Sequence, residues 1–138
     1  MIDYGKFRLS LARLIEQHAN FEATDHTVSR LDREARAESV IQRFEVCYDC
    51  LWKVLKRYLM KELGLVDPPN SPKPLLRLAR ENHLLDAPIA HWFRYADART
   101  DTTHDYDGAK ARACVALVPE FIADAIGLYE TMSGVTWD

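Results

Sequence analysis

Residues 40–59 read VIQRFEVCYDCLWKVLKRYL, and their apolar side chains recur at alternating steps of three and four. That spacing places them along one face of a helix, which predicts a long helix with an apolar seam. The seam consists of Ile41, Phe44, Tyr48, Leu51, Leu55 and Tyr58. The flanking charged residues are expected to form the solvated face: Arg43, Glu45, Asp49, Lys53, Lys56 and Arg57. Gly64 is expected to close the helix, because Pro68 and Pro69 follow just beyond it.

The same period appears on both sides of this segment. An earlier seam precedes a polar link at residues 22–32, and it runs through Tyr4, Phe7, Leu11, Leu14, His18 and Phe21. A last helix is expected to start at Asp107 or Gly108, with a wide apolar stripe made of Leu117, Val118, Phe121, Ile122, Ala125, Ile126, Tyr129 and Met132. Pro119 lies inside that stripe and is expected to kink or break the helix.

Two shorter helices are expected between the long ones. Ser71 is a candidate N-cap followed by Pro72 at the first helical position, which predicts a helix through roughly Asn82. Asp86 repeats this arrangement with Pro88 in the first turn, and that fourth helix is expected to end near Arg99. No alternating strand pattern is present. We therefore predict an all-α, single-domain chain over residues 1–138, an antiparallel bundle of about five helices with a four-helix up-and-down core.

Composition narrows the class of protein. The chain has 138 residues, 48% hydrophobic and 28% charged, which is typical of one soluble globular domain. A net charge of −3 argues against a surface that coats nucleic acid broadly. We expect no signal peptide and no membrane span, and three cysteines fit the reducing cytoplasm. Cys47 and Cys50 form a CxxC, but a zinc ribbon needs a second pair, so we interpret them as partly core.

The stretch ARTDTTHDYDG at residues 98–108 is polar where a bundle would have a simple connection. By the boundaries above it links the fourth helix to the fifth and carries Arg99, His104 and Tyr106. One interpretation is an ordinary junction: an arginine at a helix C-terminus, a Thr/Asp-rich loop and an N-cap. The other is a site, because arginine matches phosphate oxygens and histidine exchanges a proton near neutral pH.

The pattern R-x4-H-x-Y at such a junction resembles the signature of the HEPN superfamily. More narrowly, the chain resembles the nucleotidyltransferase substrate-binding proteins. Four segments carry this likeness in the right order over nearly the whole chain: residues 40–59, SPKPLLRLARENHLLD at 71–86, ARTDTTHDYD at 98–107 and VPEFIADA at 118–125. Two positions depart from the family pattern. Thr100 stands where asparagine is usual, and Asp105 adds a negative charge, which is expected to favour the protonated form of His104 and raise its pKa.

The resemblance implies a metal-independent endoribonuclease that acts as the toxin of a toxin–antitoxin pair. Arg99 would hold the phosphate and stabilise charge in the transition state, and His104 would act as general acid or base. One histidine per chain supplies no acid–base pair, so the resemblance implies a homodimer that faces two copies of the motif. RNA is the implied substrate, and no cofactor or metal is expected. Asp101 and His104 provide at most two metal ligands.

Tyr106 has a separate implied role as the site of AMPylation. A cognate minimal nucleotidyltransferase, the antitoxin, would transfer AMP from ATP to this phenol and block RNA by occlusion and charge repulsion. Asp97, Thr100 and Thr103 are the expected supporting residues. Asp97 and Asp101 either orient Arg99 or His104 or are solvated loop acids, and the second interpretation is favoured for Asp101.

Other interpretations stay open. The chain can be a non-catalytic substrate- or nucleotide-binding subunit of a nucleotidyltransferase, or a helical oligomerisation domain whose turn is only a turn. The basic stripe formed by Lys53, Lys56, Arg57 and Lys61 is either a solvated face or a guide for RNA or an acidic partner.

Overall fold

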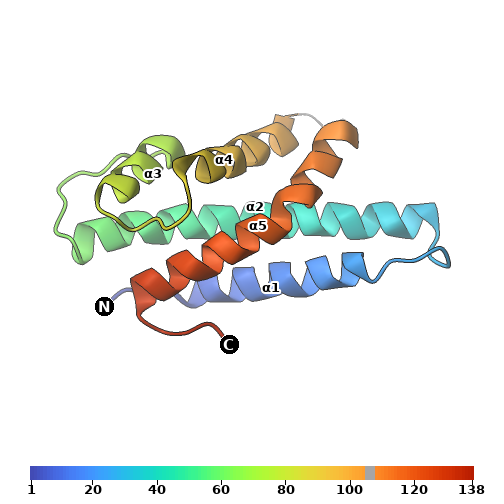
Figure 1. Ribbon diagram of the computed structural model, residues 1–138, viewed down its shortest axis with the longest axis horizontal. Helices are drawn as coiled ribbons and strands as arrows, with labels where there is room; N and C mark the ends of the chain where they lie inside the picture. Colours follow the sequence, from blue (N-terminus) through green and yellow to red (C-terminus); the bar gives the residue numbers. More distant parts are fainter. Residues whose placement is uncertain (105–107) are drawn as a thin grey trace.

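The computed structural model describes residues 1–104 and 108–138, apart from the side chains of positions 103 and 104. This part of the chain forms five helices and no strand, which confirms the all-α prediction. Figure 1 shows them in order: α1 (Gly5–Glu22), α2 (Arg30–Lys61), α3 (Pro72–Glu81), α4 (Ile89–His104) and α5 (Gly108–Ser133).

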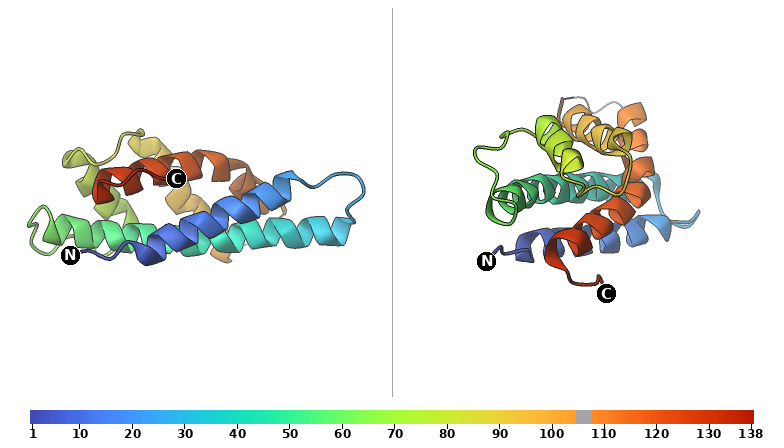
Figure 2. Two further views of the ribbon diagram at one scale, coloured as in Figure 1. Left: turned by 90° about the horizontal axis from the view of Figure 1, so that it is seen from below. Right: turned by 60° about the vertical axis from the view of Figure 1, so that its left-hand side comes forward.

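The four long helices run up and down in sequence. α1 and α2 lie side by side and antiparallel, and α4 and α5 form a second antiparallel pair stacked against them (Figures 1 and 2). α5 crosses the α1–α2 pair obliquely, while the short α3 packs beside α4 over the C-terminal half of α2. The two chain ends lie near each other, where the Tyr4 hydroxyl donates to the Met132 carbonyl at 3.1 Å.

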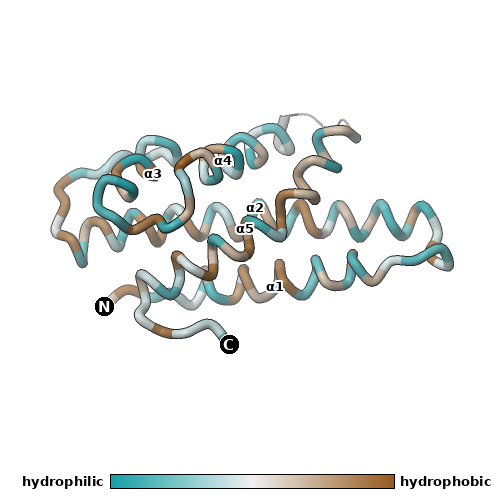
Figure 3. The backbone as a smooth tube through the Cα atoms, in the orientation of Figure 1, coloured by the Kyte–Doolittle hydropathy of each residue, from teal (hydrophilic) through white to brown (hydrophobic). Residues whose placement is uncertain are grey.

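The predicted seams form the core. Hydrophobic and hydrophilic residues alternate along α1 and α2 in Figure 3, and most of the predicted seam residues are buried, although Leu9, Leu31, Val46 and Met60 are exposed. At the centre, the Phe121 ring of α5 meets Phe44 of α2 edge-on with ring centroids 4.9 Å apart. Tyr95 of α4 meets the same Phe121 ring at 5.2 Å, so one aromatic cluster joins three helices.

Two helix ends follow from local chemistry. The Ser29 side chain accepts a hydrogen bond from the Asp32 amide at 3.1 Å and thereby caps the N-terminus of α2. At its other end Gly64 adopts φ +66°, a conformation that glycine tolerates best, and the Leu65 amide donates back to the Leu59 carbonyl at 3.0 Å. The predicted C-terminal closure of α2 is therefore confirmed.

Two predicted boundaries were wrong, the start and the end of the fourth helix. Pro88 precedes α4 instead of lying in its first turn. Pro119 does not break α5, but the α5 ribbon changes direction in its N-terminal half, which agrees with the alternative prediction of a kink (Figure 1). α4 also runs on past Arg99 to His104. In this last part of α4, Thr100 Oγ1 donates to the Ala96 carbonyl of the preceding turn at 3.2 Å. Residues 99–104 are therefore the end of a helix and not a loop.

Candidate functional site: an arginine held between two helices

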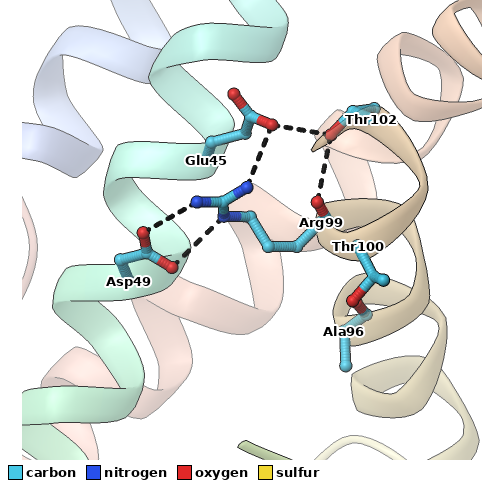
Figure 4. Close-up of polar contacts among 6 residues, drawn as sticks. All are labelled: Glu45, Asp49, Ala96, Arg99, Thr100 and Thr102. Carbon is cyan, nitrogen blue, oxygen red and sulfur yellow. Dashed lines mark hydrogen bonds and ion pairs between the residues drawn. The ribbon is translucent and has the colours of Figure 1, made fainter. Parts of the chain in front are cut away.

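Arg99 projects from α4 toward α2 and meets two carboxylates there (Figure 4). Its Nε and Nη2 donate to the two oxygens of Asp49 at 3.2 and 3.1 Å, which is a bidentate contact. Its Nη1 donates to Glu45 Oε2 at 3.1 Å. Glu45 and Asp49 lie one turn apart on α2, so their carboxylates hold the guanidinium in one orientation.

Thr102 completes the arrangement. Its hydroxyl lies 2.8 Å from Glu45 Oε2 and 3.2 Å from the Arg99 carbonyl (Figure 4). A hydroxyl has one hydrogen to donate, and the closer acceptor is the charged one, so the carboxylate is the favoured partner. Thr102 is only 6% exposed. Polar contacts thus join the last turns of α4 to α2.

Hydrogen bonding to Asp49 raises the pKa of Arg99 above its ordinary value and outweighs the opposing effect of burial. Arg99 therefore stays positively charged at every pH at which the chain folds. Glu45 and Asp49 together bring two negative charges to this one cation, so the immediate cluster is anionic by one charge. Burial and the neighbouring Asp49 also raise the pKa of Tyr48, which remains a neutral phenol.

An open groove of about 830 Å³ runs past this cluster between α2, the start of α3 and the end of α4. Its walls include Tyr48, Trp52, Lys73 and Asp97, and Arg99 lies along it. A groove of this size can take a nucleotide-sized ligand, because small-molecule sites commonly enclose roughly 300–1,000 Å³.

The structure describes only some of the residues predicted to form the site. Asp97 pairs with Lys73 of α3, Oδ1 to Nζ at 2.6 Å, and its role in orienting Arg99 or His104 stays a prediction. The hydroxyl of Thr100 turns back along α4, as described above. His104 is the last residue of α4, five positions after Arg99, but its side chain and that of Thr103 lie outside the described residues. Asp105 and Tyr106 also lie outside them.

Sequence reasoning missed Glu45, Asp49 and Thr102. The two acids were assigned to the solvated face of α2 because charged residues usually occupy it. The sequence did contain a signal for the two acids. They stand four residues apart, and each directly follows a seam residue: Glu45 follows Phe44, and Asp49 follows Tyr48. Acids that border a seam lie at the edge of the helix interface, where a cation from another helix can reach them.

The remaining predicted features have simple structural roles. Cys47 is buried, and burial raises its thiol pKa to about 12, which disfavours the thiolate needed for metal or redox chemistry. The basic stripe on α2 is largely exposed: Lys53 and Arg57 lie on the surface, and Lys56 donates to the Asn70 side chain at 3.1 Å. Within the described residues, no helix is both long and apolar enough to cross a bilayer.

Comparison with known proteins agrees with this fold. A curated relative from Haemophilus influenzae named "Probable ribonuclease HepT" is 32% identical over 94 residues, which cover 67% of this chain and 64% of the relative. A solved structure from Thermus thermophilus superposes with a TM-score of 0.75 at 29% identity, covering 92% of this chain and 98% of the other.

A Haemophilus influenzae structure described as the fold of a substrate binding domain of a nucleotidyltransferase superposes with a TM-score of 0.84. It is 23% identical and covers 94% of this chain and 98% of its own, and it bears on the fold alone. Residues 2–134 match a family described as "Nucleotidyltransferase substrate binding protein like". The match spans all five helices, and the chain therefore belongs to this family.

Proposed function

We propose that this chain is a HEPN-type toxin, a metal-independent endoribonuclease of a toxin–antitoxin pair that acts in the cytoplasm. The observation that carries the proposal is Arg99, held by two carboxylates of α2 beside a groove large enough for a nucleotide. The relative named "Probable ribonuclease HepT" supports the reaction class.

The proposed reaction needs only groups that these residues supply. The 2′-hydroxyl of RNA attacks the adjacent phosphorus and loses its proton to a base, while the 5′-oxygen leaves and takes up a proton. The products are a cyclic phosphate and a free 5′-hydroxyl. His104 is the proposed acid–base group, and Arg99 stabilises the charge on the phosphate oxygens.

The helix geometry favours a second copy of the chain in this reaction. Five residues of an α-helix correspond to about 140° of rotation and roughly 7.5 Å of rise. On an ideal helix, positions 99 and 104 therefore lie on different faces. A homodimer that brings two copies of this helix end together supplies two arginines and two histidines to one scissile linkage.

We further propose that a cognate minimal nucleotidyltransferase silences the toxin. The Tyr106 phenol attacks the α-phosphorus of ATP, pyrophosphate leaves, and the tyrosine carries AMP. The new phosphodiester adds negative charge near a cluster that is already anionic, and RNA is repelled.

RNA cleavage by the purified chain in excess chelator tests the ribonuclease. Arg99→Ala and His104→Ala should each reduce the rate, the latter by at least about 100-fold if it removes general acid–base catalysis. Arg80→Ala and His26→Ala alter exposed residues of the same types and serve as matched controls. Undiminished cleavage by both site variants would exclude this mechanism.

Intact-mass measurement tests the silencing. Incubation with the cognate nucleotidyltransferase and ATP should add one or more AMP units to the wild-type chain and none to Tyr106→Phe. An adduct that persists in Tyr106→Phe places the modification elsewhere.

One observation favours a second function, a non-catalytic substrate- or nucleotide-binding subunit of a nucleotidyltransferase. The carboxylates of Glu45 and Asp49 already match the charge of Arg99, so a phosphate must compete with them. This function predicts a stable complex with a nucleotidyltransferase and no RNA cleavage by either protein alone.

A further inference from the structure

A second polar cluster lies between α4 and α5, about two turns before Arg99 on α4. His91 and Tyr95 stand one turn apart on α4, and Glu120 and Asp124 stand one turn apart on α5. His91 Nδ1 lies 3.2 Å from Asp124 Oδ2 and 3.3 Å from Glu120 Oε1. The Tyr95 hydroxyl contacts the same two oxygens, Asp124 Oδ2 closely and Glu120 Oε1 at 3.2 Å.

These contacts outnumber the hydrogens available to make them. The phenol of Tyr95 has one hydrogen and the Nδ1 of His91 has at most one, yet each atom faces two carboxylate oxygens. Tyr95 is fully buried, and the Asp124 side chain is only 17% exposed. Among the described residues, Asp124 has no ion-pair partner except His91, and a histidine carries a positive charge only when it is protonated. A half-buried carboxylate in this setting favours an additional positive charge.

The spacing of the ligand atoms suits a metal ion. Tetrahedral Zn²⁺ binds nitrogen and oxygen ligands at roughly 2.0–2.1 Å, which places neighbouring ligand atoms about 3.3 Å apart. The two separations from His91 Nδ1 are 3.2 and 3.3 Å, and the three ligand atoms lie within 4.8 Å of one another. We propose that His91 Nδ1, Glu120 Oε1 and Asp124 Oδ2 bind one Zn²⁺ ion, with water in the fourth position.

The surroundings are compatible with this site. The buried Tyr95 hydroxyl donates its one hydrogen to the Asp124 carboxylate, and this hydrogen bond orients the carboxylate for binding the ion. Arg94 approaches Glu120 from the solvent side with a half-exposed side chain, and it also contacts Oε1. Ion binding to Oε1 requires Arg94 to move from Oε1 to Oε2 of the same carboxylate, which a half-exposed side chain can do.

The ion would connect α4 to α5 at a distance from the proposed reaction. His91 precedes Arg99 by eight residues, roughly 12 Å along the helix. The proposed role of the ion is therefore to hold α4 and α5 together. This role is compatible with RNA cleavage that needs no metal at Arg99 and His104.

Zinc binding by the full chain tests the site directly. The metal-free protein is titrated with Zn²⁺ by calorimetry, and then with Co²⁺, whose visible absorption reports tetrahedral coordination. We expect one ion per chain and a higher thermal midpoint with zinc. His91→Ala and Asp124→Asn should abolish the stoichiometric ion, the cobalt spectrum and the thermal shift, and circular dichroism verifies that both variants fold.

Two controls separate this site from others. His26→Ala removes an exposed histidine in the α1–α2 link and should bind zinc as the wild type does. His104→Ala alters the proposed catalytic residue and should also keep the ion, so loss of RNA cleavage and loss of zinc are independent results. No binding by the wild type, or equal binding by Asp124→Asn, overturns the proposal.

Discussion

The contact between Arg99 and Asp49 makes a quantitative prediction. Asp49→Asn removes a charge that accepts two hydrogen bonds, at 3.2 and 3.1 Å, and leaves the half-buried guanidinium with Glu45. Bonds to charged groups contribute roughly 1.5–3 kcal/mol when buried, and exposed ion pairs about 0.2–1 kcal/mol. The two side chains are 28% and 38% exposed, so solvent screening reduces the larger figure. We expect Asp49→Asn to lower the free energy of unfolding by about 1 kcal/mol.

A double-mutant cycle in urea isolates this interaction. Asp49→Asn, Arg99→Gln and the double variant should give a coupling energy near 1 kcal/mol. A matched cycle on Arg30 and Glu34, an exposed pair at 2.9 Å one turn apart on α2, should give only about 0.3–0.5 kcal/mol. If the Arg99–Asp49 coupling is no larger than that of the exposed pair, the bidentate contact does not fix the end of α4 and the argument for a preorganised arginine fails.

Three further results are expected. Phe121→Ala empties the centre of the aromatic cluster and should cost about 3–5 kcal/mol in a denaturant titration, whereas a loss below 1 kcal/mol would mean that the cluster is not the core. Burial raises the thiol pKa of Cys47 to about 12, so the folded state disfavours its thiolate: the stability gained by keeping it protonated is complete below about pH 9 and is lost as pH rises toward 12. At pH 8, mass spectrometry should find alkylation of Cys47 much slower than that of the half-buried Cys50, and equal rates would contradict the burial. Gly64→Ala places a side chain at φ +66° and should lower stability by about 1 kcal/mol, which an unchanged thermal midpoint would refute.

The helices themselves could be predicted because their signals are local. Apolar residues at steps of three and four mark the buried face of α2, and Gly64, Ser71 and Pro72 mark helix ends through their own backbone preferences. The boundaries that failed depend on partners from other helices. α4 continues past Arg99 because Thr102 reaches Glu45 on α2, which is 57 residues away in the chain. No residue close to Thr102 in the sequence indicates that contact.

The sequence by itself determined that the chain is a helical bundle of this family, since periodicity and ordered motifs are properties of the linear chain. Only the tertiary structure decided which charges meet. Whether Glu45 and Asp49 face water or Arg99, and whether His91 meets Asp124, depends on how far each helix is rotated and shifted against its neighbour. Packing of the aromatic core sets that rotation and shift. Neighbouring residues on a helix point in directions about 100° apart, so a small change in rotation changes which charged side chains meet.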